Sequence, residues 1–126
     1  MKKRTKKFCL FGLSLGATRC AVDDPALKID PVDVAVGRAY YIACAACHGR
    51  DLVSVGAPGP DLRESRLALD GDAFMSAVHG GALIEKGMPN FGIMTPKQVM
   101  QIRAYIRQGA RDALQAAQAG RAPAAK

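Results

Sequence analysis

The clearest alternation of apolar and polar positions lies in the last third of the 126-residue chain. Val99, Ile102 and Ile106 recur at the three- and four-residue spacing of one helix face. The segment TPKQ at 95–98 combines a capping box with proline at the first helical position, so the helix is expected to begin there. The polar residues between the apolar ones are expected to face outward: Gln101, Arg103, Arg107 and Gln108.

Two earlier stretches carry comparable start signals. Asp30 followed by Pro31 predicts a helix that runs through the tyrosines at 40–41 to a pair of cysteines. Asp70 predicts the cap of a second helix, which has apolar residues four apart on one face and ends at the glycine pair 80–81. No strand pattern accompanies these helices, so the predicted fold class is all-α.

The chain divides by composition into four parts. A leader at 1–20 is followed by a polar linker at 21–30, and one folded domain is expected at 31–113. The Ala-rich tail at 114–126 is expected to fray or to be disordered. Within the domain the core must be thin, because the chain has no Trp and only four Phe and three Tyr. A large flat group would fill the space that aromatic side chains leave.

The basic residues are concentrated in the leader. The net charge is +7, but six of the 18 Lys and Arg and none of the 11 acidic residues fall in residues 1–20. The rest of the chain therefore holds 12 basic and 11 acidic residues. Nucleic-acid binding requires a dense basic face on the folded part, so no nucleic-acid partner is expected.

The leader has the features of an export signal. Its basic start is followed by an apolar run from Phe8 to Ala17, which is too short to span a bilayer. An amphipathic helix is the alternative, and the cleavage site is poorly marked. A lipid anchor on Cys20 would attach the protein to a membrane, but Arg19 stands where lipoprotein signals have a small residue.

The motif CAACH places Cys44, Cys47 and His48 within five positions. Two cysteines three apart on a helical turn can reach the two vinyl groups on one edge of a porphyrin. The following histidine then lies under the iron as an axial ligand. Export agrees with this interpretation, since haem c is attached outside the cytoplasm. The motif therefore predicts one covalently attached haem c.

Two other chemistries use closely spaced cysteines. A thioredoxin-like dithiol pair follows a strand, whereas the surroundings here are helical. A structural zinc site needs four ligands, but the other thiols, Cys9 and Cys20, belong to the leader. The remaining histidine, His79, cannot complete such a site alone, so both alternatives are disfavoured.

Residues 32–112 resemble the class I (mono-haem) c-type cytochromes. The resemblance rests on CAACHG preceded by Gly37 and the tyrosines at 40–41, and on Tyr105 in IRAYIRQG. It implies a cytochrome c fold, with about three main helices and loops wrapped around one haem. It also implies that Gly37 lets the C-terminal helix cross closely and that Tyr105 is an aromatic partner at this crossing.

The resemblance also implies a second axial ligand. Met88 lies in GMP, the setting of the distal methionine in this family, where Gly87 frees the backbone and Pro89 prevents a helix. The alternatives are Met94, Met75, His79 or an open site. Met94 and Met75 are otherwise expected to pack as apolar residues, and His79 is expected to lie exposed at a helix end.

In similar cytochromes a proline carbonyl accepts a hydrogen bond from the proximal histidine. Pro60 in GAPGPDL fits that position, with Pro58 as the second choice and a plain surface turn as the alternative. Such a bond orients the imidazole ring and increases its basicity as a ligand.

A His–Met iron leaves no position for a substrate, so a periplasmic single-electron carrier is expected and not an enzyme. The segments HGGALIEKGMPNF and PKQVMQIRAYIRQGARD resemble cytochrome c domains that accept electrons from quinoprotein (PQQ) alcohol dehydrogenases. This resemblance implies a dehydrogenase as donor, an oxidase or reductase as acceptor, and a monomer or dehydrogenase subunit. The rival functions are a haem enzyme or gas sensor with an open or labile sixth ligand, and a haem-free interaction module.

Overall fold

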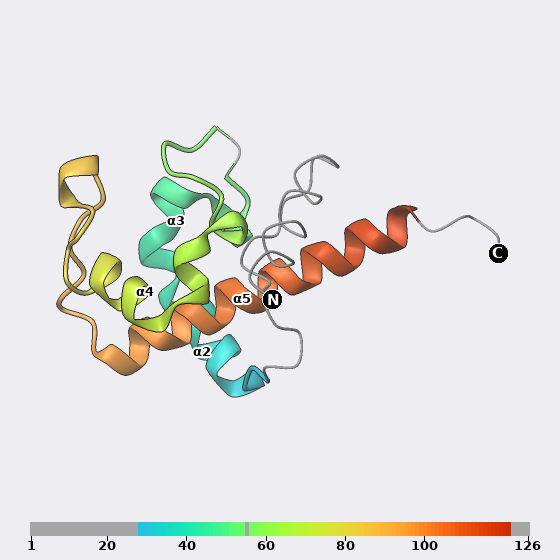
Figure 1. Cartoon of the computed structure of the whole chain (residues 1–126), viewed down its shortest axis with the longest axis horizontal. Coiled ribbons are helices and arrows are strands. Elements are labelled where there is room, and N and C mark those ends of the chain that lie inside the picture. The colour runs from blue at the N-terminus through green and yellow to red at the C-terminus, as the bar shows by residue number, and fades with distance from the viewer. Residues whose placement is uncertain (1–27, 55, 122–126) are drawn as a thin grey trace.

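The computed structural model describes residues 28–54 and 56–121, which contain helices and turns but no strand (Figure 1). The α-helices are α2 (Pro31–Tyr40), α3 (Ile42–His48), α4 (Gly71–Val78) and α5 (Pro96–Arg121). Short 3-10 turns connect them: η1 (Arg50–Leu52), η2 (Leu62–Glu64), η3 (Arg66–Leu69) and η4 (Ile84–Lys86). The predicted all-α fold class is confirmed. The predicted leader, with Cys20, lies outside the described residues.

Side-chain caps confirm the three predicted helix starts. The carboxylate of Asp30 accepts a hydrogen bond from a backbone N–H in the first turn of α2, at 2.8 Å. Asp70 accepts two such bonds from α4, at 2.9 and 3.0 Å. Thr95 and Gln98 form the reciprocal capping box of α5, in which each side chain accepts from the other residue's N–H.

The C-terminal helix is longer than the sequence suggested. α5 continues through residue 121, so residues 114–121, part of the stretch 114–126 that was expected to fray or to be disordered, are helical. Alanine and glutamine are good helix formers. In addition, the Gln108 amide donates to the Asp112 carboxylate one turn later, at 2.9 Å. The last turns of α5 extend away from the other helices (Figure 1).

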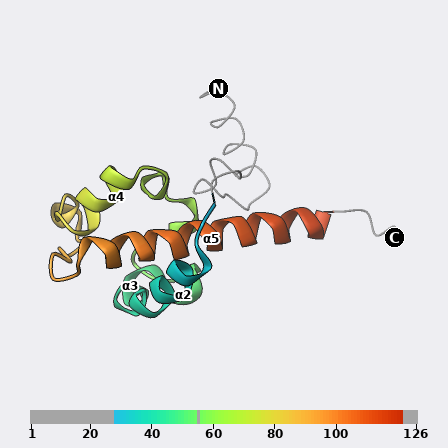
Figure 2. The same cartoon turned by 90° about the horizontal axis from the view of Figure 1, so that it is seen from below.

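α2 and α5 cross at Gly37, where a Cβ would overlap the backbone carbonyl oxygen of Gln101. Beside this point the rings of Tyr41 and Tyr105 pack with their centroids 5.3 Å apart and their planes tilted by 58°. The predicted close crossing and its aromatic pair are therefore confirmed. Figure 2 shows that α5 runs between α4 on one side and α2 and α3 on the other.

The core is built mainly on α5, as its apolar pattern predicted. Val99, Ile102 and Ile106 are at most 1% exposed, and they belong to one buried cluster with Phe74 of α4 and Leu52 of η1. No helix in the described part of the chain is long and apolar enough to cross a membrane.

The outward orientation predicted for the polar residues of α5 needs correction. Gln101 and Arg107 are both only 8% exposed, and the Gln101 amide donates to the Asp33 carboxylate on α2 at 2.9 Å. Arg103 is half-buried and donates to two backbone carbonyls at the end of η3, at 2.8 and 3.2 Å. Because α5 packs against neighbours on two sides, polar residues beside its apolar face are buried as well.

Candidate functional site: an apolar cavity with thiol, imidazole and thioether groups

A cavity of about 450 Å³ lies between α3, α4 and the loops before and after α4. Its walls are mostly apolar and include Pro60, Leu62, Leu67, Phe74, Leu83 and Phe91. α3 contributes Cys44, Cys47 and His48 to the wall, and the loop after α4 contributes Met88. The fold thus brings together the four side chains that the sequence marked as possible haem-binding groups.

Cys44 and Cys47 lie one turn apart on α3 and do not form a disulfide. Cys44 is half-buried, and Cys47 is exposed. Burial, with a smaller contribution from Cys47, raises the pKa of the Cys44 thiol to about 11. α3 follows the helix α2 rather than a strand, which disfavours the redox-pair alternative.

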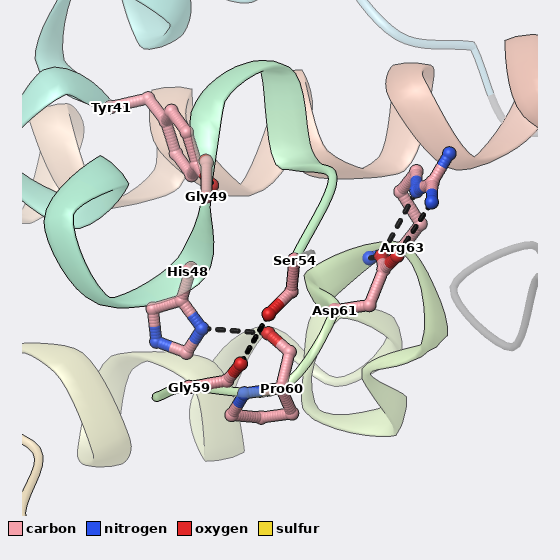
Figure 3. Close-up of polar contacts among 8 residues, drawn as sticks. All are labelled: Tyr41, His48, Gly49, Ser54, Gly59, Pro60, Asp61 and Arg63. Atoms are coloured by element: carbon pink, nitrogen blue, oxygen red, sulfur yellow. Dashed lines mark hydrogen bonds and ion pairs between the residues drawn. The ribbon is translucent and has the colours of Figure 1, made fainter. Parts of the chain in front are cut away.

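His48 is buried at the end of α3, and its ring nitrogen Nδ1 lies 2.8 Å from the carbonyl oxygen of Pro60 (Figure 3). A carbonyl oxygen can only accept a hydrogen bond, so Nδ1 carries the proton. The lone pair of Nε2 is therefore left for a ligand bond. The hydrogen bond expected from the sequence is present at Pro60; the second choice, Pro58, also lines the cavity.

Two neighbours of His48 were missed by the sequence reasoning. A Cβ on Gly59 would lie 2.8 Å from His48 Nδ1, so the absence of a side chain lets the loop pack against the ring. The Ser54 hydroxyl donates to the Gly59 carbonyl at 2.5 Å (Figure 3). The GAPGP turn was a signal that could have indicated Gly59, whereas nothing in the sequence singled out Ser54.

The other candidate ligands lie elsewhere. Met75, Met88 and Met94 all pack against the buried core. Of the methionines in the described residues, Met88 alone also lines the cavity. Gly87 directly before Met88 has a left-handed backbone, with φ of 98°, and ends the η4 turn. His79 forms the C-terminal cap of α4 and is half-buried, so its predicted exposure is wrong.

The residues present fit a covalently attached haem. Two thiols one turn apart, an imidazole with a free Nε2 lone pair and a thioether line the same cavity. The rest of the wall is largely apolar, as a buried porphyrin face requires.

Residues 34–106 match the family described as cytochrome c oxidase, cbb3-type, subunit III. The match covers more than half of the chain and includes the CAACH motif and Met88. The chain belongs to this family. As a c-type cytochrome it has the cytochrome c fold and a covalently bound haem c with iron, as the sequence predicted.

The cytochrome is also similar to segments of larger proteins. It is 40% identical over 77 residues to the dehydrogenase subunit of alcohol dehydrogenase (quinone) of Komagataeibacter europaeus. It is 38% identical over 77 residues to the same subunit of Acetobacter aceti, and 37% identical over 83 residues to 1-butanol dehydrogenase (cytochrome c) of Thauera butanivorans. These matches cover 60%, 60% and 61% of the chain but only 10%, 10% and 11% of the relatives. The predicted resemblance to cytochrome c domains of alcohol dehydrogenases is confirmed by these quinone- and cytochrome c-dependent relatives.

Proposed function

We propose that this cytochrome is a periplasmic single-electron carrier whose haem c is attached through Cys44 and Cys47 and ligated by His48 and Met88. The proposal rests on one observation: these four side chains line the same largely apolar cavity. When bound, the haem supplies an iron that alternates between its ferric and ferrous states by one electron.

Each residue of the cavity has a distinct task in this proposal. Cys44 and Cys47 would hold the haem through thioether bonds. His48 would supply the lone pair of Nε2 to the iron, while its Nδ1–H donates to the Pro60 carbonyl, which sets the ring orientation. Met88 would supply a thioether sulfur as the second ligand, and this ligand together with the apolar wall would favour the ferrous state.

Two protein ligands leave no position at the iron for a substrate, which favours electron transfer over catalysis. The similarity to alcohol dehydrogenase (quinone) and to 1-butanol dehydrogenase (cytochrome c) supports a quinoprotein dehydrogenase as electron donor. A respiratory oxidase or reductase would then take the electron. The export features of residues 1–20 support the periplasm as the location.

Apolar contacts are expected to dominate docking to these partners. Ile42 is 80% exposed next to the cavity-lining Ala43, and Ile84 is 54% exposed next to the cavity-lining Leu83. The chain after the leader is close to electrically neutral, so long-range steering should be weak.

Stopped-flow mixing with a quinoprotein alcohol dehydrogenase and an alcohol tests this function. We expect the haem to be reduced at least about tenfold faster than that of an unrelated cytochrome of similar potential, because a specific encounter raises the association rate. Mixtures without alcohol serve as the control. Reduction no faster than that of the unrelated cytochrome would contradict the proposed donor. Fast carbon monoxide binding to the ferrous protein would instead favour the haem enzyme or gas sensor.

A further inference from the structure

In the loop that follows the CAACH motif, a side-chain hydrogen bond joins Ser54 to Gly59. The Ser54 hydroxyl donates to the Gly59 carbonyl at 2.5 Å, and the Gly59 N–H donates to the Cys47 carbonyl at 2.5 Å. The next residue, Pro60, accepts the hydrogen bond from His48 Nδ1 at 2.8 Å. In Figure 3 the bonds of Ser54 and His48 converge on the Gly59–Pro60 segment. We propose that Ser54 is a positioning residue, which acts through this segment to hold the Pro60 carbonyl in place for His48.

The covalent geometry of proline explains how a bond to Gly59 can orient the carbonyl of Pro60. The Gly59 carbonyl belongs to the planar peptide group that joins Gly59 to Pro60, so the Ser54 bond fixes that plane. The proline ring fixes the following φ angle near −65°. Only the ψ angle of Pro60 then remains to direct its own carbonyl oxygen toward the imidazole.

Apart from the bond of the Gly59 N–H to Cys47 and the packing of Gly59 against His48, this loop is open. A Cβ on Gly56 would meet no atom within 4 Å, and the side chains of Pro58 and Pro60 are exposed. Ser54 itself is half-buried, which shields its hydrogen bond from water. Removing the hydroxyl should therefore release the Gly59–Pro60 segment and weaken the bond to His48.

The expected consequence rests on the proposed function, in which His48 is an iron ligand. A strong bond from Nδ1 to a carbonyl makes the imidazole a better electron donor, which favours ferric iron. Weakening that bond should favour the ferrous state, so the reduction potential should rise.

The sharpest test compares Ser54→Val with Ser54→Thr in the haem-loaded protein. The two variants have nearly the same shape, but only the threonine keeps a hydroxyl. We expect Ser54→Val to shift the ferrous-to-ferric ratio at a fixed reference potential about threefold towards ferrous, or about 28 mV at 59 mV per tenfold for one electron. Ser54→Thr should stay close to wild type. Ser76→Ala, on the exposed side of α4, is the control for loss of a serine hydroxyl and should cause no shift.

The absorption spectrum separates failure of this proposal from failure of the proposed function. An unchanged potential in Ser54→Val, with the low-spin six-coordinate spectrum intact, would overturn the positioning role alone. A wild-type spectrum without six-coordinate iron would overturn both. Ser54→Ala is the second variant if the valine prevents folding, and it should shift the potential in the same direction.

Discussion

At the crossing of α2 and α5 the two backbones touch, whereas around the haem cavity the chain segments stand apart. Gly37 lies so close to the Gln101 carbonyl that no Cβ fits between them. The cavity loops, residues 56–67 and 81–91, instead supply Pro60, Met88 and apolar side chains to a space of about 450 Å³. The crossing thus has no room for an added side-chain atom. The cavity, in contrast, has room for a prosthetic group.

This difference indicates what each region can tolerate. At the crossing, a single added methyl group would push the two helices apart. The stability of the protein should therefore depend very strongly on side-chain volume there. In the cavity loops, hydrogen bonds to side chains and to α5 decide where the cavity-lining residues lie. Changes there should affect local stability and the properties of the iron more than folding of the whole domain.

Gly37→Ala should produce the largest effect. Alanine normally stabilises a helix relative to glycine. Here its Cβ overlaps backbone atoms that cannot move independently, so we expect a loss of about 3 kcal/mol in the free energy of unfolding. Denaturant unfolding of the haem-loaded protein measures the loss. Gly71→Ala is the control, because its Cβ meets only side-chain ends, those of Met100 at 3.1 Å and Arg103 at 3.9 Å. A Gly37→Ala variant more stable than wild type would show that the helices do not cross this closely.

Arg103→Met should have a somewhat smaller effect. Arg103 connects α5 to the cavity loops, since it donates to two carbonyls at the end of η3, where Leu67 lines the cavity. The loss of these charge-assisted bonds should lower the free energy of unfolding by about 2 kcal/mol. Thermal or denaturant unfolding measures the change, and Lys97→Met at an exposed position of α5 provides the control. Equal stabilities of the two variants would contradict a connecting role for Arg103.

Tyr41→Phe should have the smallest effect, and this effect should depend on pH. The Tyr41 hydroxyl donates to the Gly49 carbonyl at 2.7 Å, a bond worth about 1 kcal/mol. Burial, assisted by Tyr105, raises the pKa of Tyr41 above its ordinary value of 10.0. The unfolded chain therefore loses this proton at lower pH than the folded protein, and wild-type stability should fall as pH rises above 10.

Unfolding at pH 7, 9 and 11 tests the role of Tyr41. The stability gap between wild type and Tyr41→Phe should be constant up to pH 9 and shrink at pH 11, because only the wild type has this ionisable group. A gap that widens at pH 11 would show that the hydroxyl ionises more easily in the folded protein.

Much of the fold and site could be predicted because it depends on local chemistry. Asp30, Asp70 and the capping box at 95–98 fix helix starts through contacts within one turn. The CAACH motif and the GMP segment carry their chemistry in adjacent residues, although the ligand roles of His48 and Met88 remain predictions.

What could not be predicted depends on contacts between distant segments. The burial of Gln101 comes from α2 packing beside it, and the bonds of Arg103 come from η3. Ser54 owes its contact with Gly59 to the path of a loop that no periodic pattern describes. The length of α5 was underestimated for another reason: its Ala-rich end was interpreted as a tail, although alanine favours helix.

The most direct test of the account is the absorption spectrum of the exported protein, oxidised and reduced, for wild type, Met88→Leu and Met94→Leu. We expect covalent low-spin haem with a sulfur-to-iron charge-transfer band in wild type and Met94→Leu, and loss of that band in Met88→Leu. Absence of the band from wild type, or its survival in Met88→Leu, would contradict ligation by Met88 and with it the six-coordinate electron carrier.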